Sequence, residues 1–311
     1  MGESLSKRVL KAATDLDYRP NALARGLLRK RTHTLGLLIT DIANSFFGEI
    51  LRGIEEVCRK QGYSIFICNT DRDPATVAEY VGVLREKQVD GVLIVGGGVS
   101  GPQPFDVLPA YRVPVVVLGR FDAPLPAARI NYLKGGWKAA KHLIELGHRR
   151  IGVILGPRKS TTSHDIMRGY RQAFAEHGVT VANDAMLHGD AQAASALSCA
   201  ERLLRTASRP TGLLAVNDHI AMGSIRAARN LGLRVPQDIS IVGFDGIELG
   251  SFMNPALTTL RLPIRQMGVT VAEMILRLIA GEEISREVWF EPELIVREST
   301  APPPVTGEAP E

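Results

Sequence analysis

Polar and aromatic residues follow several of the expected strands, and their types suit recognition of a small polar molecule. Carboxylate and amide groups hydrogen-bond to hydroxyls, and an aromatic ring stacks on the apolar face of a sugar. In doubly wound sheets, ligands bind outside the C-terminal ends of the strands. The sequence therefore predicts a polyol-binding cleft, with Asp245 as its leading contact. The candidate residues are Asn44, Phe46, Phe47, Arg120, Asn217 and Asp245.

Each candidate also has a structural alternative. Asn44, Asn217 and the adjacent Asp218 can cap the helices that follow them. The two phenylalanines can belong to the core, with one of them lining the cleft. Arg120 can form an ion pair at the surface. The residues alone leave these alternatives open.

No catalytic motif accompanies these residues. The sequence lacks GxSxG, a P-loop, HExxH, and a GxGxxG that follows a strand. His164 and Asp165 are adjacent, but neighbouring residues on a helix diverge, which argues against a catalytic dyad. The cysteines at 58, 68 and 199 show no CxxC spacing and are expected to be buried thiols in a reducing compartment. We therefore expect no enzyme activity, metal site or cofactor.

The elements that position the candidates alternate between strand and helix. Apolar runs of strand length recur through residues 35–243, separated by stretches with helical spacing of apolar residues. This repetition occurs twice, and two late strands follow at 287–290 and 293–296. The pattern predicts an α/β fold of two Rossmann-like lobes with a cleft between them. The expected earlier strands are 34–42, 64–68, 91–95, 113–118, 151–155, 186–187, 212–216 and 239–243.

Charge is distributed unevenly along the 311 residues. Residues 1–33 hold eight Lys/Arg and three Asp/Glu, whereas the whole chain carries a net charge of +4. A basic first tenth beside a nearly neutral body indicates a polyanionic partner at that end, and the alternative is a solvated basic helix. No apolar run reaches the roughly 18 residues of a membrane span, and the charged N-terminus argues against export. A cytoplasmic protein with no membrane partner is expected.

The stretch Asn21–Leu28 has the composition of an unusual short helix. Asn21 can cap it, and its small residues would let another backbone approach closely. Leu23 and Leu27 lie four residues apart and form one apolar edge. About two turns are too few for an isolated stable helix. On the residues alone, a plain linker helix is favoured over an apolar wedge, backed by Arg25, of the kind that opens a DNA minor groove.

An ordered set of segments is spread over nearly all of residues 4–300. These segments are YRPNALARGL, TLGLLITDIANSFFGEILRGIEE, NTDRDP, QVDGVLIVG, ELGHRRIGVILG, AVNDHIAMGSIRAARNLGLRVPQDISIVGFDG, PALTTLRLP and PELIVREST. With these segments in this order, the sequence resembles the LacI/GalR family of bacterial transcription regulators.

The resemblance implies a sensor of periplasmic-binding-protein type, with three-layer αβα lobes, whose chain crosses between the lobes near Tyr132, Arg261 and Pro292. One lobe would comprise 34–131 plus 262–290, and the other 132–261 plus 291–300. Residues 1–33 would form a helical DNA-binding remnant. Independently of the resemblance, the Pro-rich composition of 301–311 predicts a disordered tail. The resemblance also assigns Asn217 to the ligand and leaves Asp218 as the helix cap.

The resemblance further implies that 21–28 is a hinge helix, which pairs with its copy in a homodimer and enters the minor groove of operator DNA. The implied DNA-binding residues are Asn21, Leu23, Ala24, Arg25 and Leu27. The family opens with a helix-turn-helix, whereas this sequence starts in what resembles its third helix. Either the sequence is truncated or its gene start is misplaced. As written, it is expected to be impaired in base-specific contacts.

The expected function is therefore a ligand-responsive transcription regulator, a repressor, with an effector that is a sugar or related metabolite. The alternative is the solute-binding protein of a sugar transporter. Three positions depart from the family's ligand pattern, namely Ile166 in place of an arginine, Ala191 in place of an aromatic, and Leu262 in place of a polar residue. Loss of the arginine removes a bidentate clamp. An effector other than a typical hexose, larger or less polar, is expected.

Overall fold

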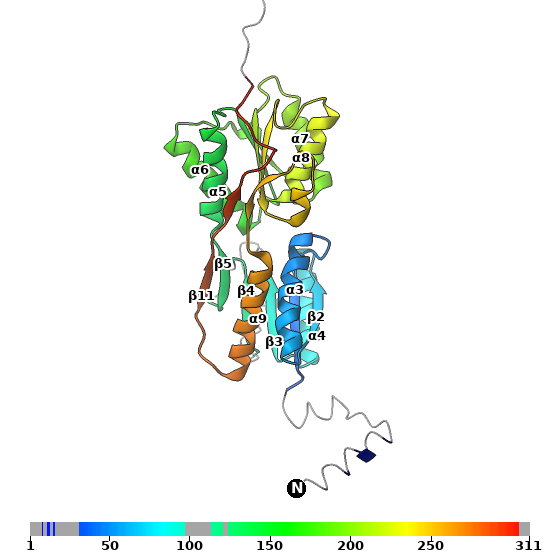
Figure 1. Ribbon diagram of the computed structural model, residues 1–311. Helices are drawn as coiled ribbons and strands as arrows, with labels where there is room; N and C mark the ends of the chain where they lie inside the picture. Colours follow the sequence, from blue (N-terminus) through cyan, green and yellow to red (C-terminus); the bar gives the residue numbers. More distant parts are fainter. Residues whose placement is uncertain are drawn as a thin grey trace, which may run out of the picture.

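The protein folds into two α/β lobes, each built on its own sheet (Figure 1). The structure is a computed structural model that describes residues 31–96, 113–120 and 124–304, together with Arg8, Lys11, Ala12 and Asp15, which are helical. The predictions for Asn21, Leu23, Ala24, Arg25 and Leu27 lie outside the described residues. Within the described part of the chain, no helix is long and apolar enough to cross a membrane.

The sheet of the N-terminal lobe has the order β11-β5-β4-β3-β1-β2. All its neighbouring strands are parallel. The late strand β11 thus joins a sheet formed mainly by the first third of the chain (Figure 1). The strands are β1 (Thr34–Ile39), β2 (Ser64–Asn69), β3 (Gly91–Val95), β4 (Val115–Leu118), β5 (Ala127–Ile130) and β11 (Glu287–Phe290).

Helices cover both faces of this sheet. On one face α3 (Ser45–Lys60) packs beside α9 (Ile264–Ala280), and α4 (Pro74–Glu86) covers the other (Figure 1). Successive strand residues point to opposite faces. Accordingly, Leu35 and Leu37 join the buried cluster under α3, whereas Leu38 joins Leu84 of α4 in a second cluster. The apolar run of β1 is buried on both faces, as expected for a central parallel strand.

The C-terminal lobe repeats the plan with the order β12-β10-β9-β8-β6-β7. Its neighbours are parallel except β12, which runs antiparallel to β10. Helices α5 and α6 pack together on one face, and α7 and α8 on the other (Figure 1). The elements are β6 (Ile151–Leu155), β7 (Met186–His188), β8 (Gly212–Ala215), β9 (Ser240–Asp245), β10 (Thr258–Arg261), β12 (Glu293–Ile295), α5 (Tyr132–Glu145), α6 (Thr161–Glu176), α7 (Ala193–Leu204) and α8 (Asp218–Asn230).

Helices α5 and α6 touch backbone to backbone through two glycines. A Cβ on Gly169 would lie 2.0 Å from the Leu133 carbonyl oxygen, and one on Gly136 would lie 2.3 Å from the Ile166 carbonyl oxygen. Only residues without a side chain permit this approach. The contact fixes the start of α6, and hence Asp165, against the segment where the chain enters the C-terminal lobe.

The expected fold class, two Rossmann-like three-layer lobes of periplasmic-binding-protein type, is confirmed. The chain passes between the sheets after Ile130, after Arg261 and after Phe290. Strands β5 and β10 were not predicted, and α6 begins at Thr161 rather than at Asp165. Both missed strands are only four residues long and include polar residues, so their apolar runs are too short to stand out.

Two expectations about other regions need correction. Ala301 was expected in a disordered tail, but its carbonyl accepts hydrogen bonds from His148 Nε2 at 2.9 Å and from Ser240 Oγ at 2.9 Å.

Cys58 and Cys68 are buried as expected, and burial raises the pKa of each thiol to about 11. Cys199 is only half-buried, and its thiol donates to the His188 carbonyl oxygen at 3.6 Å.

Candidate functional site

A cavity of about 90 Å³ lies between the two lobes, at the C-terminal ends of their strands. This space, called the cleft below, has the position predicted for ligand binding in a doubly wound fold. It brings together five of the six predicted effector residues, from both lobes. Its lining includes Thr40, Asn44, Phe46, Phe47, Arg72, Tyr132, Ser160, Thr162, Ser163, Ala191, Asn217 and Asp245.

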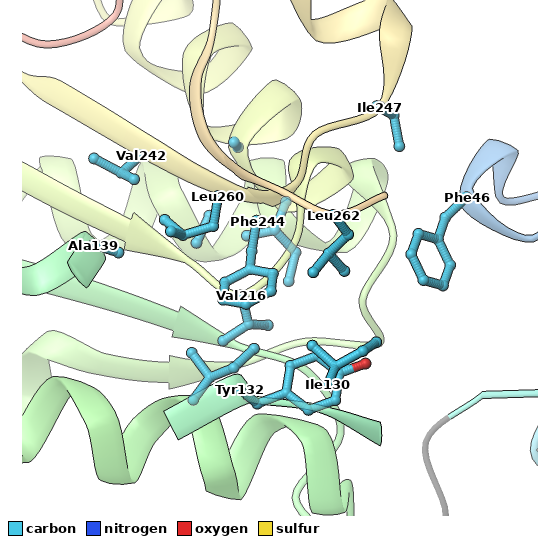
Figure 2. Close-up of a cluster of buried hydrophobic side chains, with 14 of the residues drawn as sticks. Phe46, Ile130, Tyr132, Ala139, Val216, Val242, Phe244, Ile247, Leu260 and Leu262 are labelled. Carbon is cyan, nitrogen blue, oxygen red and sulfur yellow. The ribbon is translucent and has the colours of Figure 1, made fainter. Parts of the chain in front are cut away.

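The N-terminal lobe contributes the loop between β1 and α3. Asn44 is buried and caps α3, because its Oδ1 accepts the Phe46 amide N–H at 3.0 Å. The rings of Phe46 and Phe47 meet edge to face with centroids 5.1 Å apart. Both rings are buried, which confirms the core alternative, and both also line the cleft. Figure 2 shows Phe46 reaching from this lobe toward the side where Leu262 lies.

The assignment of Asn217 to the ligand and Asp218 to the helix cap is wrong in its second half. Asn217 caps α8, with its Oδ1 accepting the Ile220 N–H at 2.7 Å. Asp218 is buried instead beneath the cleft, where it accepts Thr259 Oγ1–H at 2.5 Å and the Ile247 N–H at 2.8 Å. Asn217 still lines the cleft, and its Nδ2 donates to the Ala191 carbonyl oxygen at 3.0 Å. That bond restrains Ala191, whose φ of +74° is strained for a residue with a side chain.

Asp245 ends β9 and points its carboxyl group into the cleft. Within the described residues, no hydrogen bond or ion pair engages this carboxyl. Burial, together with the charge of Asp218, raises the pKa of Asp245 well above its ordinary value. Burial also raises the pKa of Asp218 to about 7, although its hydrogen bond from Thr259 acts in the opposite direction. The cleft floor therefore holds two interacting carboxyl groups, of which only Asp245 reaches the cavity.

Tyr132 forms the wall of the cleft beside the first crossing. Its ring lies 5.8 Å from that of Phe244, tilted by 39°, in the apolar cluster of Figure 2. Burial, followed by the charge of Asp245, raises the pKa of its hydroxyl. The hydroxyl is thus held as a neutral donor near the carboxyl of Asp245.

The structure does not bring Arg120 into the cleft with the other candidates. Its guanidinium pairs with Asp165 of α6, and its carbonyl oxygen accepts Thr161 Oγ1–H at 3.4 Å. Both contacts join the two lobes. The arginine lines a separate cavity, so the ion-pair alternative describes its role in this structure better than the ligand alternative does.

Several cleft residues were not predicted. Thr40 follows β1, Arg72 follows β2, and Ser160, Thr162 and Ser163 follow β6, so the rule that identified Asn44 also applied to them. Thr40 Oγ1 is buried and has no hydrogen-bond partner in the described structure. Buried hydroxyls normally find a partner, so this oxygen is an exception among the described residues.

Arg72 bears on the inference that the cleft lacks a bidentate clamp, which was drawn from Ile166 standing in place of an arginine. Ile166 is fully buried, and Leu262 is buried in the apolar cluster. The C-terminal lobe therefore supplies no guanidinium at position 166, and no polar side chain stands at position 262. Arg72 lines the same cleft from the N-terminal lobe, so a clamp for hydroxyls or carboxylates is still available.

A hydrogen bond bridges the lobes at the cleft. The Gln192 side-chain amide donates to Asp41 Oδ2 at 2.5 Å, and the other oxygen of Asp41 accepts the Ala43 N–H at 3.0 Å. With the Arg120–Asp165 pair, this bond holds the lobes together from both sides. In this arrangement the cleft, at about 90 Å³, is smaller than the roughly 300–1,000 Å³ of typical small-molecule sites.

Comparisons with known proteins match this architecture. A family model described as a periplasmic binding protein-like domain matches residues 140–300. The HTH-type transcriptional repressor PurR of Aliivibrio salmonicida is 36% identical over 302 residues, covering 96% of this chain and 91% of the relative. PurR of Photobacterium profundum is 35% identical over 303 residues, covering 96% and 90%.

Solved structures give the same result. A LacI family transcriptional regulator from Enterococcus faecium with bound ribose has a TM-score of 0.78 and 30% identity, covering 86% of this chain and 99% of that chain. The transcriptional regulator CelR in complex with cellobiose has a TM-score of 0.79 and 28% identity, covering 96% and 91%.

The two lobes and the cleft between them define a ligand-binding domain of the periplasmic-binding-protein class. The repressors above are similar along nearly the whole chain, beyond that domain alone. The chain belongs to the LacI family of transcription regulators. It is a ligand-responsive transcription regulator rather than the solute-binding protein of a transporter.

Proposed function

We propose that a small-molecule effector binds in the cleft and contacts Asn44, Phe46, Phe47, Asn217 and Asp245. The observation that carries this proposal is the unpartnered carboxyl of Asp245, which faces a cavity enclosed by both lobes. The carboxyl of Asp245 is half-buried and open to the cavity, so its hydrogen-bonding capacity is available to a ligand. A bound group that donates a hydrogen bond to Asp245 would use that capacity.

The lining favours a compact effector with both polar and apolar faces. The side chains at 46, 47 and 132 offer aromatic surface, whereas Asp245 and Thr40 accept hydrogen bonds. Arg72 can donate to an oxygen on the effector's opposite side. A sugar or a related metabolite has this combination, and ribose and cellobiose occupy two of the structural relatives. The apolar residues at 191 and 262 favour a ligand other than a common free hexose.

Coupling to DNA requires a firm connection between the cleft and residues 1–33. Asp90 supplies it, because its Oδ1 accepts the Thr32 N–H at 2.8 Å and its Oδ2 accepts the His33 N–H at 2.9 Å. Arg31 adds a hydrogen bond to the carbonyl oxygen of Ile279 at 2.8 Å, in the last turn of α9. Any rotation of the N-terminal lobe is therefore passed to the segment that precedes Thr32.

In this scheme residues 1–33 contact operator DNA, with Leu27 as the minor-groove wedge, in a cytoplasmic homodimer. The lobes are 34–131 plus 262–290, and 132–261 plus 291–300. The effector changes the angle between the lobes and hence the spacing of the two hinge helices. Its effect on DNA affinity equals its difference in affinity for the two lobe arrangements. No catalytic step is part of this function.

A thermal-shift screen of metabolites tests the proposed effector site, because a ligand specific to the folded state raises the melting temperature by mass action. Each compound that stabilises the protein is repeated with Asp245→Asn and with Asp184→Asn, an exposed carboxylate of the same lobe. The proposal expects the shift to disappear in the first variant only. A shift that survives Asp245→Asn, Phe46→Ala and Asn44→Ala alike would place the ligand elsewhere.

A further inference from the structure

A second cavity, called the side pocket below, lies where the chain leaves β5 and enters α5. Its volume is about 360 Å³, within the range of small-molecule sites. Both lobes form it, and Tyr132 is the residue that its lining shares with the cleft. The lining comprises Gly119, Arg120, Arg129, Ile130, Asn131, Tyr132, Leu133, Asp165, Arg168, Glu287 and Trp289.

The charged residues of the side pocket carry an excess of positive charge. Arginines 120, 129 and 168 line it, against the two carboxylates of Asp165 and Glu287. Arg129 Nε lies 2.6 Å from Glu287 Oε1, and its side chain is only 19% exposed. Asp165 is also largely enclosed, and a single oxygen, Oδ1, faces both Arg120 and Arg168.

Arg168 keeps much of its hydrogen-bonding capacity, and its side chain is 64% exposed. Its Nη1 approaches Asp165 Oδ1 only at 3.4 Å. A guanidinium presents five N–H donors in a planar fork that matches a carboxylate. The remaining donors of Arg168 are therefore available to an anion at the wall formed by α6.

Trp289 supplies an apolar, aromatic surface to the side pocket, in contrast to the charged arginines. It lies on the edge strand β11, directly across from Arg129 of β5 in the parallel register. Its side chain is 55% exposed, and its Nε1 donates to Glu287 Oε2 at 3.2 Å. An exposed indole beside guanidinium groups offers a face on which a flat ring can stack.

We propose that the side pocket is a second binding site, distinct from the effector cleft, for a small aromatic carboxylic acid. The ring lies against Trp289 and the carboxylate accepts hydrogen bonds from Arg168. The ligand then contacts α6 of one lobe and β11 of the other. Because these elements move relative to each other when the lobes open, the acid favours the lobe arrangement seen here.

Tryptophan fluorescence can test this proposal, because the chain has two tryptophans. The variant Trp137→Phe leaves Trp289 as the reporter. Benzoate is titrated against it, with benzamide as a ring without charge and acetate as a charge without a ring. We expect a saturable change in emission with benzoate and a response about tenfold weaker with benzamide, the loss that one charge-assisted hydrogen bond predicts. Acetate should also bind more weakly, because it lacks the ring that stacks on Trp289.

Variants locate the site. Arg168→Gln should weaken benzoate binding about tenfold, whereas Arg171→Gln, an exposed arginine one turn along the same helix, should not change it. Asp245→Asn, in the cleft, should also leave benzoate binding unchanged. Equal responses to benzoate and benzamide, an unaffected Arg168→Gln, or a loss in Asp245→Asn would each overturn the proposal.

Stabilisation by benzoate in thermal denaturation of the wild-type protein and of Arg168→Gln provides a second readout, which does not require Trp137→Phe to fold. The wild-type protein should be stabilised and the variant should not. Equal stabilisation of the two proteins would contradict the proposed site. Because the readouts are independent of DNA and of the effector, their failure would leave the cleft proposal intact.

Discussion

Gln192 of the C-terminal lobe donates a hydrogen bond to Asp41 of the N-terminal lobe, with a nitrogen-to-oxygen distance of 2.5 Å. Gln192 immediately follows Ala191, whose carbonyl is held by Asn217. The bridge between the lobes is therefore attached to a residue that lines the cleft. A ligand that displaces Asn217 from Ala191 would disturb the bridge as well, which gives the cleft a direct route to the lobe angle.

Substitution of Gln192 should open the lobes in a graded way. Gln192→Ala removes a hydrogen bond to a charged group at a partly buried position, worth about 1 kcal/mol here, or about a fivefold change in the closed population. Gln192→Glu places two carboxylates together and should open the lobes further.

Energy transfer between dyes on the two lobes measures the change. Gln172→Ala, which loses a hydrogen bond within α6, should leave the transfer unchanged, and an identical transfer in all four proteins would contradict the bridge.

The carboxyl pair at the cleft floor predicts an unusual pH dependence of stability. The folded state raises the pKa of both Asp218 and Asp245, so it binds protons more tightly than the unfolded state. Their contribution is therefore fully present below about pH 4, the ordinary pKa of aspartate. The part due to Asp218 is lost as the pH rises through about 7, and the part due to Asp245 is lost as the pH rises through its own raised pKa. Melting temperatures should fall over this window.

Asp245→Asn separates stability from function at the same position. It removes a charge that has no partner in the described structure, so the variant should be more stable than the wild type by about 1–2 kcal/mol at pH 8. The difference should shrink toward pH 5, and effector binding should be lost. Urea unfolding at several pH values measures the change, and a variant less stable than the wild type at pH 8 would refute the assignment.

Two glycines in helices should respond in opposite directions to alanine. Gly169→Ala puts a Cβ 2.0 Å from the Leu133 carbonyl oxygen and should destabilise the fold by about 3 kcal/mol. Gly82, in α4, has nothing within 4 Å of the position that a Cβ would take, so Gly82→Ala should stabilise the fold by about 0.5–1 kcal/mol. Denaturant midpoints provide the measurement. Similar effects of the two changes would show that α5 and α6 do not pack so closely.

Asp90 should matter for the transmission of the signal and not for effector binding. Asp90→Ala leaves the amides of Thr32 and His33 without their acceptor and loosens the link to residues 1–31. We expect an unchanged dissociation constant for the effector, measured by calorimetry, and a smaller effect of the effector on operator affinity. Asp184→Ala is the control, and a normal operator response in Asp90→Ala would contradict this role.

The cleft was predictable because its position follows from topology. Strands such as 91–95 are apolar throughout, so the parallel sheet could be inferred, and the residues after each strand then had to converge. The same rule would have found Thr40 and Ser160. Local sequence could not show which residue caps α8, because Asn217 and Asp218 both suit a cap and the choice depends on where the helix starts. Thr259, which donates a hydrogen bond to the buried Asp218, lies 41 residues further along the chain.

Arg120 shows a second limit of sequence patterns. Its place after β4 suggested the cleft, but its direction is set by Asp165, which is 45 residues further on and held by the glycine contact between α5 and α6. Neither the ion pair nor the close helix contact has a local signature. Side-chain direction in this part of the site therefore became visible only in the folded structure.

The account depends on an effector in the cleft that changes DNA binding, and operator affinity measured with and without that effector tests this most directly. The full-length protein is titrated onto labelled operator DNA by fluorescence anisotropy, using a metabolite found in the thermal-shift screen. We predict that the saturating metabolite shifts the dissociation constant at least about fivefold, and that Asp245→Asn abolishes the shift while still binding the operator. The same operator affinity at zero and saturating metabolite, or a full response in Asp245→Asn, would contradict the account.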